Sequence, residues 1–292
     1  MKKINLNLKC VCIIAFDGLE YDLVEEFNLE KIKQCECGKI DVSLFKMLAT
    51  PIVWASFITG VPPEEHGLDD LIAWRNPIIQ KLRRLSIRLK LDRIGGKGKI
   101  FELLGFKRGE FYDLMVEKFK NRKTKTLFDV IANSKAFSVP PYQKWISDKT
   151  RFLMKEAVEN EEKVAAFEEH VWSVFEEKRE KCLEIIEDGN WNLFMAHFMF
   201  TDLLAHIYIG NSAKMFEVYA EAEKFVDDVT KILPEKTLLL IVSDHGMERL
   251  DEGMFGEHSD HGFYSSNVKL GLVNPKITDF FDLVVGMFES GV

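Results

Sequence analysis

The sequence has few cysteines and no long apolar run. Its five cysteines are an odd number in 292 residues, whereas a chain held together by disulfides carries many more. We therefore expect a reducing, cytoplasmic setting. No apolar stretch approaches the roughly 18 residues that a membrane-spanning helix needs. Near the N-terminus the apolar run 11–16 is short and Asp17 ends it, so we expect a first strand there and not a signal peptide.

The overall composition is that of a folded globular protein. Hydrophobic residues make up 47% and charged residues 29%, which excludes a disordered chain and a collagen-like repeat. The length fits one large α/β domain with an insertion, or two domains. We predict that residues 1–292 form a single domain.

Charge is distributed unevenly along the chain. Residues 75–125 contain sixteen lysines and arginines against five acidic residues, a local charge of +11, although the net charge of the whole chain is −8. This composition shift predicts a basic cap insertion over 70–125. Apolar residues at helical spacing between Ile78 and Leu89 alternate with lysine and arginine. They predict a helix with a solvated face, a cap over a phosphate-rich substrate, or a surface for anionic lipid or nucleic acid.

The remaining chain alternates short apolar runs with longer stretches of helical periodicity. This pattern is typical of a mainly parallel sheet between helices, the α/β class. The predicted strands are 11–16, 136–139, 194–200, 238–242 and 269–273. The predicted helices are 53–59, 150–187, a helix that follows Asn211 and Ser212, and 278–287.

Three of the predicted strands run directly into acidic residues. Asp17 follows the first strand, Asp202 follows 194–200, and Asp244 follows 238–242. Because the carboxyl ends of parallel strands face one crevice, these carboxylates should converge there. Like charges packed together repel one another, so a bound cation is the economical explanation.

Histidines accompany two of these acidic residues. Asp202 and His206 are four residues apart, a spacing that puts both on one face of a helical turn, and His245 directly follows Asp244. Aspartate and histidine together favour zinc, manganese or iron over calcium or magnesium. Taken singly, an aspartate at a strand end is more often a helix N-cap, and a lone Asp-x-x-x-His pair is more often solvated. Their combination favours the metal interpretation.

Four ordered blocks of residues resemble the type I phosphodiesterase / nucleotide pyrophosphatase family of the alkaline phosphatase superfamily. The blocks are Asp17 after the first strand, Thr50 to Gly60 followed by His66 and Gly67, Asp202 to His206, and Ser243 to Met247 with His261, Gly262 and Phe263. The resemblance implies an alkaline-phosphatase-like fold and two divalent metal ions, with zinc as our first choice and manganese or iron as alternatives.

The resemblance also implies two sets of ligands. One ion would be bound by Asp17, Asp244, His245 and the hydroxyl group of Thr50, and the other by Asp202, His206 and His261. Thr50 would be the nucleophile and would pass through a covalent phosphothreonine. The amide groups at the start of helix 53–59 would suit a phosphoryl oxygen.

The sequence departs from the family pattern at two positions of the site. Nucleotide-cleaving members have an asparagine three residues after the nucleophile, where this chain has Val53. His258 lies three residues before His261, so the last metal ligand could be either one. We prefer His261, because the sequence His-Gly-Phe matches the family.

These observations predict a two-metal hydrolase of phosphate esters, acting on phosphodiesters or nucleotide pyrophosphates. The alternatives are a phosphoryl or phospholipid-headgroup transferase, or a non-catalytic module that binds metal and phosphate. The sequence contains no signal for the oligomeric state.

Overall fold

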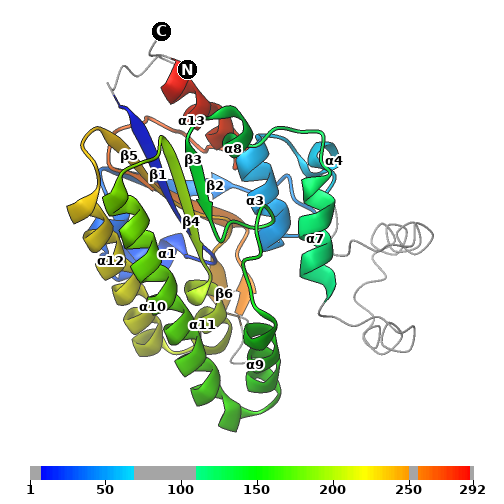
Figure 1. Ribbon diagram of the computed structural model, residues 1–292. Coiled ribbons are helices and arrows are strands. Elements are labelled where there is room, and N and C mark those ends of the chain that lie inside the picture. Colours follow the sequence, from blue (N-terminus) through cyan, green and yellow to red (C-terminus); the bar gives the residue numbers. More distant parts are fainter. Residues whose placement is uncertain (1–7, 69–109, 250–255, 290–292) are drawn as a thin grey trace.

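The computed structural model describes residues 8–68, 110–249 and 256–289, and its centre is a sheet covered by helices on both faces (Figure 1). Within this part of the chain the main sheet has six strands in the order β2-β8-β5-β1-β4-β3. Its strands are β1 (Cys10–Phe16), β2 (Glu36–Asp41), β3 (Ser134–Phe137), β4 (Leu193–Phe198), β5 (Thr237–Ser243) and β8 (His261–Ser266). A separate pair joins β6 (Met247–Arg249) to β7 (Gly256–His258).

The sheet is mixed but mostly parallel, which confirms the predicted α/β class. Strand β1 pairs in parallel with β4 on one side and β5 on the other, and β3 pairs in parallel with β4. Strand β8 runs antiparallel to both β5 and β2. The four predicted strands nearest to β1, β3, β4 and β5 are confirmed within two residues at each end.

The prediction of a strand over 269–273 is wrong. The backbone there turns around the carboxylate of Glu36, which accepts hydrogen bonds from the amide groups of Leu270 (2.9 Å), Gly271 (2.8 Å) and Leu272 (3.1 Å). Gly271 has a φ of +67°, which an extended strand does not contain. The amide groups that would have formed a ladder are bonded to one side chain.

Helices form a layer on each face of the sheet. One layer contains α1 (Tyr21–Glu26), α2 (Glu30–Lys33), α9 (Asp148–Glu159), α10 (Val164–Asp188), α11 (Phe200–Tyr208) and α12 (Ser212–Ile232). The other contains α3 (Thr50–Thr59), α4 (Pro63–His66), α7 (Glu110–Lys120), α8 (Leu127–Val130) and α13 (Asp279–Glu289). Side chains of β1 point alternately into the two resulting cores, so both of its faces are buried.

Three helix predictions are refined by the structure. The stretch 150–187 is two helices, because the backbone of Asn160 is extended and its side chain accepts a hydrogen bond from the amide of Glu162, at 2.9 Å. Asn211 caps α12 as its side chain accepts from the amide of Lys214. Helix α3 begins at Thr50 itself, three residues earlier than predicted.

The predicted basic insertion lies mostly outside the described residues. Of the range 70–125, the structure describes 110–125, where α7 packs Met115 and Phe119 into the core beside α3. The predicted helix between Ile78 and Leu89 is not among the described residues. In the described part of the chain, no helix is long and apolar enough to cross a bilayer.

Candidate metal centre

The carboxyl ends of β1, β4 and β5 lie side by side and bring the predicted acidic residues together. In register, Phe16 of β1 pairs with Phe198 of β4 and with Ser243 of β5. The residues that follow these positions, Asp17 and Asp244, leave the sheet at the same edge, and α11 starts nearby and carries Asp202. All three aspartates are buried.

One group of side chains surrounds the Nε2 atom of His245. This nitrogen lies 3.2 Å from Oδ1 of Asp17 and 3.5 Å from Oδ2 of Asp244. The hydroxyl group of Thr50 donates a hydrogen bond to Oδ1 of Asp17, at 3.2 Å. The backbone of His245 is held by Ser243, whose hydroxyl donates to the His245 carbonyl oxygen at 2.7 Å. The structure therefore gathers the four residues that the sequence assigned to one ion.

A second group surrounds Oδ1 of Asp202. His206 Nε2 lies 3.4 Å from this oxygen and His258 Nε2 lies 3.7 Å from it. The ring of His258 stacks on His245, with 3.6 Å between ring centroids and 12° between planes. Its other nitrogen, Nδ1, lies 3.3 Å from the carbonyl oxygen of Leu48. The two groups are thus neighbours, and Asp202 lies close enough to Asp17 and His245 to belong to both.

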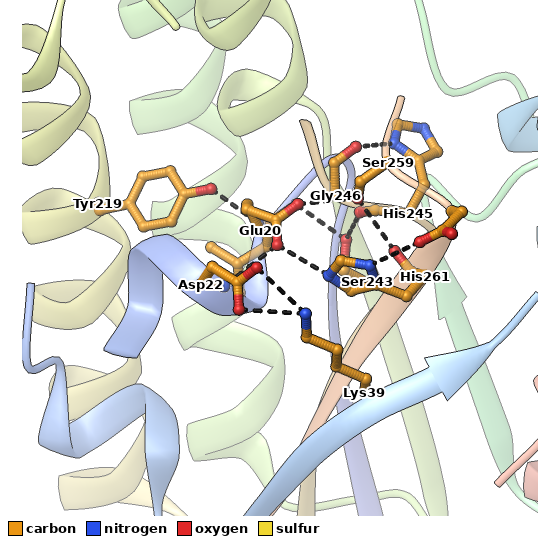
Figure 2. A network of polar contacts seen from close by, with 11 residues as sticks. Glu20, Asp22, Lys39, Tyr219, Ser243, His245, Gly246, Ser259 and His261 are labelled. Carbon is orange, nitrogen blue, oxygen red and sulfur yellow. Dashed lines mark hydrogen bonds and ion pairs between the residues drawn. The ribbon is translucent and has the colours of Figure 1, made fainter. Parts of the chain in front are cut away.

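The arrangement does not place His261 with Asp202 and His206, where the sequence analysis put it. Figure 2 shows the His261 ring turned toward Glu20, with Nε2 at 2.8 Å from Glu20 Oε1. The hydroxyl of Ser259 donates to the other oxygen of Glu20, also at 2.8 Å. Glu20, Asp22 and His261 are close enough to bind a cation, but Lys39 already pairs with Asp22 at 3.1 Å. This cluster is an internally paired network beside the site.

The first two groups contain buried polar atoms without hydrogen-bond partners. Among the described residues, these atoms include Oδ2 of Asp17, Oδ1 of Asp202, both carboxylate oxygens of Asp244 and Nε2 of His245. Buried polar atoms are rarely left unpaired, because desolvation without a partner costs about 1–3 kcal/mol, and more for a charged group. Carboxylate oxygens and an imidazole nitrogen that converge in this way fit a divalent metal ion.

The pKa values of two of the aspartates show that their negative charges are unfavourable without a cation. Burial raises the pKa of Asp202 to about 6. Burial, followed by the charge of Asp17, raises the pKa of Asp244 well above its ordinary value. Burial also opposes the charge on His245, but Asp244 and Asp17 outweigh it and raise its pKa to about 10. A cation would compensate the carboxylates in place of a proton.

His197 is a site neighbour that the sequence analysis did not include among the site residues. It lies on β4, is fully buried, and its Nε2 is 3.4 Å from Oδ2 of Asp17. Burial lowers the pKa of His197 despite the contact with Asp17. The position could have been noticed from the predicted strands, because His197 comes at the carboxyl end of β4 opposite Ala15.

The first turn of α3 leaves one amide group without a partner in the helix. Pro51 has no amide hydrogen, and the amides of Ile52 and Val53 both donate to the carbonyl oxygen of Ala49, at 2.8 and 3.1 Å. Thr50 is thus the residue of the first turn whose amide hydrogen the helix does not use. We expected several amides of this helix to be available for a phosphoryl oxygen, but in the first turn only the Thr50 amide is left unused by the helix. The side chain of Val53 is fully buried in the core and has no hydrogen-bond donor.

Gly18 allows the close approach of β1 and α11. Its φ is +68°, in the left-handed region, and a Cβ atom at this position would lie 2.9 Å from Cβ of Asp202. Real Cβ contacts are longer, so a larger residue would displace Asp202 or the turn.

The fold and the site together define an α/β protein with buried Asp/His groups that could hold a metal ion at the carboxyl edge of a mostly parallel sheet. The sequence profile of the type I phosphodiesterase / nucleotide pyrophosphatase family matches residues 11–262. The chain therefore belongs to this family of metal-dependent phosphodiesterases and pyrophosphatases, within the alkaline phosphatase superfamily.

Individual relatives are distant or match only over short segments. The chain is 31% identical over 62 residues to GPI ethanolamine phosphate transferase 3 of Saccharomyces cerevisiae, which is 21% of this chain and 6% of that protein. It is 25% identical over 95 residues to the protein of the same name in Schizosaccharomyces pombe, covering 32% of this chain and 10% of that one. The chain thus spans a tenth or less of these curated relatives.

Solved structures of similar proteins have low identity. Murine ectonucleotide pyrophosphatase / phosphodiesterase 5, as an inactive variant in complex with AMP, has a TM-score of 0.48 at 15% identity, covering 84% of this chain and 59% of that one. Phosphonoacetate hydrolase from Sinorhizobium meliloti has a TM-score of 0.45 at 11% identity, covering 82% of this chain and 57% of that one.

Proposed function

We propose that this protein is a two-metal phosphodiesterase that uses Thr50 as a covalent nucleophile. The observation that carries the proposal is the position of the Thr50 hydroxyl group. It lies at the start of α3, 3.2 Å from Oδ1 of Asp17, in a cluster where several buried carboxylate oxygens have no hydrogen-bond partner among the described residues. Membership of the phosphodiesterase / nucleotide pyrophosphatase family supports the same chemistry.

The proposed ligands form two sets. One ion would be bound by Asp17, Asp244, His245 and the hydroxyl group of Thr50, and the other by Asp202, His206 and His258. We now assign His258 as the third ligand in place of His261, because Nε2 of His258 lies beside Asp202, whereas His261 is bonded to Glu20. Carboxylate and imidazole donors favour zinc, with manganese or iron as alternatives. Bound divalent ions would supply Lewis acidity that lowers the pKa of the Thr50 hydroxyl and stabilises the leaving oxygen.

The residues of the chain perform the remaining steps. Asp17 orients Oγ1 of Thr50, which forms a bond to phosphorus while the bond from phosphorus to the departing alcohol oxygen breaks. The Thr50 hydroxyl group gives up its proton in this step, and the departing oxygen takes up a proton and leaves as the alcohol. Water then attacks the phosphothreonine, which releases the phosphate product and restores the hydroxyl of Thr50. The amide of Thr50, which the helix does not use, would donate to a phosphoryl oxygen.

Transfer to an alcohol is the second candidate function. It is favoured by Val53, which stands where nucleotide-cleaving members have an asparagine, and by the short similarity to two fungal GPI ethanolamine phosphate transferases. In this case the phosphothreonine would form in the same way, but an acceptor alcohol would attack it instead of water.

The test compares Thr50→Ala with Thr50→Ser in protein loaded with zinc or manganese. An aryl phosphodiester, an aryl phosphomonoester and an aryl sulfate are supplied separately, and product release is followed by absorbance. We expect the phosphodiester to be hydrolysed, Thr50→Ser to retain measurable activity, and Thr50→Ala to lose it while still binding metal. Repeating the assay with added ethanolamine or glycerol, and analysing products by mass spectrometry, separates transfer from hydrolysis.

Two results would contradict the proposal. If Thr50→Ala is as active as the unmodified protein, Thr50 is not the nucleophile. If the metal-loaded protein turns over none of the three substrates, with or without an acceptor alcohol, the catalytic assignment fails.

A further inference from the structure

A cavity of about 450 Å³ lies between α9, α10 and the connection from β4 to α11. These elements are neighbours in the helical layer on one face of the sheet (Figure 1). The walls are mostly apolar and include the buried side chains of Val171, Phe175 and Phe198, together with Trp145. A concave, mostly apolar cavity with few polar groups is typical of a site for an organic ligand.

Lys178 is the polar group that gives this cavity a chemical preference. Its ammonium group donates to Oγ of Ser138 at 2.6 Å and to the carbonyl oxygen of Trp145 at 3.3 Å. An ammonium has three donor hydrogens, so one remains. Within the described residues, no acidic side chain forms an ion pair with Lys178. Burial desolvates this positive charge, and the carboxylates of Glu177 and Asp17 act on it without forming an ion pair.

The other charged groups that line the cavity have partners elsewhere. Glu177 pairs with Lys181 at 2.6 Å, and Lys144 pairs with Asp113 at 3.4 Å. Lys178 is thus the charged group of this cavity that is left to bind a ligand.

The cavity adjoins the proposed active site through α11. Phe200 and Leu203 line the cavity, whereas Asp202, between them in sequence, faces the metal-binding groups. The charge of Lys178 also acts on His197, the neighbour of Asp17. The cavity and the metal-site candidates therefore share α11 as a common wall.

We propose that the cavity binds the organic part of the substrate, and that this part is an apolar group carrying a carboxylate or a comparable acidic group that pairs with Lys178. The inference rests on the proposed function for its kinetic consequence, because it names the substrate class. Binding of the anionic group to the cavity does not depend on turnover.

The first experiment measures binding directly. Isothermal titration with 4-phenylbutyrate and with its uncharged amide is performed on the metal-loaded protein, with inorganic phosphate present to occupy the metal-binding groups. We expect the carboxylate to bind more tightly than the amide. Lys178→Met should weaken carboxylate binding about 10- to 100-fold, the range of a charge-assisted hydrogen bond, and leave amide binding unchanged.

Two further variants control this result. Lys224→Met removes the same charge at an exposed position of α12 that does not line the cavity, and should change neither affinity. Val174→Trp fills the cavity and should abolish binding of both probes, with an unfolding curve that verifies the fold. Equal affinities of Lys178→Met and Lys224→Met for the carboxylate, or unchanged binding in Val174→Trp, would overturn the inference.

The second experiment uses catalysis and separates the two proposals. Two aryl phosphodiesters that differ by one carboxylate on the aryl group are compared, and the kcat/KM preference for the acidic one should disappear in Lys178→Met. If neither diester is hydrolysed although the binding pattern holds, the proposed function fails and the cavity assignment stands. If both are hydrolysed with a ratio that Lys178→Met does not change, the cavity assignment fails and the function stands.

Discussion

Exchange of either His258 or His261 for alanine distinguishes the two assignments of the last metal ligand. His258→Ala removes an imidazole nitrogen that lies 3.7 Å from Oδ1 of Asp202. His261→Ala removes a partner of Glu20, which would still accept hydrogen bonds from Ser259 at 2.8 Å and from the Asp22 amide at 3.1 Å. The two variants remove the same group three residues apart, so each is the matched control of the other.

The expected magnitudes follow from these contacts. A residue that only orients a metal ligand changes metal affinity about 10- to 100-fold. His261 is bonded to Glu20, which is not one of the proposed ligands and keeps two of its partners, so His261→Ala should lower metal affinity by less than about 10-fold. His258 is one of three proposed protein ligands of its ion. His258→Ala should therefore lower the affinity for that ion by more than about 100-fold, or about 2.8 kcal/mol.

Elemental analysis and chelator competition measure this difference. Unmodified protein equilibrated with zinc should contain about two equivalents after gel filtration, because the ligands form two sets. His258→Ala should contain about one equivalent, and His261→Ala should contain about two. A His261→Ala protein that retains one equivalent, beside a His258→Ala protein that retains both, would refute the assignment drawn from the structure.

Three further predictions concern the fold and the cavity. Glu36→Ala leaves three backbone amide groups without their acceptor, so it should lower the free energy of unfolding, measured by urea denaturation, by about 2–3 kcal/mol. The control Glu30→Ala changes a side chain that is 68% exposed and should alter the free energy of unfolding by less than about 0.5 kcal/mol. Gly18→Ala should reduce zinc content and activity, because its Cβ would meet Asp202 at 2.9 Å; normal metal content in this variant would contradict the packing argument. Burial lowers the pKa of Lys178 to about 8, so the ammonium form is present below that pH. The affinity for 4-phenylbutyrate should therefore fall as pH rises through about 8, which titration calorimetry at several pH values would detect. Lys178→Met should abolish this pH dependence.

The predicted strands succeeded where burial on both faces produces an uninterrupted apolar run. Strands β1, β4 and β5 lie in the middle of the sheet, and each is buried along nearly its whole length. Strand β2 was missed, since its sequence mixes polar and apolar residues and much of it is only partly buried. Strand β8 was missed because it begins within the motif His-Gly-Phe and its second half contains two serines. The apolar segment 269–273 was assigned as a strand since its pattern does not reveal the distant carboxylate of Glu36.

The residue types of the site could be predicted from the sequence, whereas the contacts between residues distant in sequence could not. Acidic residues directly after apolar runs, and a histidine four residues from Asp202, are local signals that parallel strands bring to one edge of a sheet. The choice between His258 and His261 depends on where Glu20 lies, 241 residues from His261 in sequence. Likewise, the sequence does not show that the ammonium group of Lys178 bonds to Ser138, 40 residues away. Periodicity and spacing describe neighbours on one element, but contacts between elements are decided by packing of the whole chain.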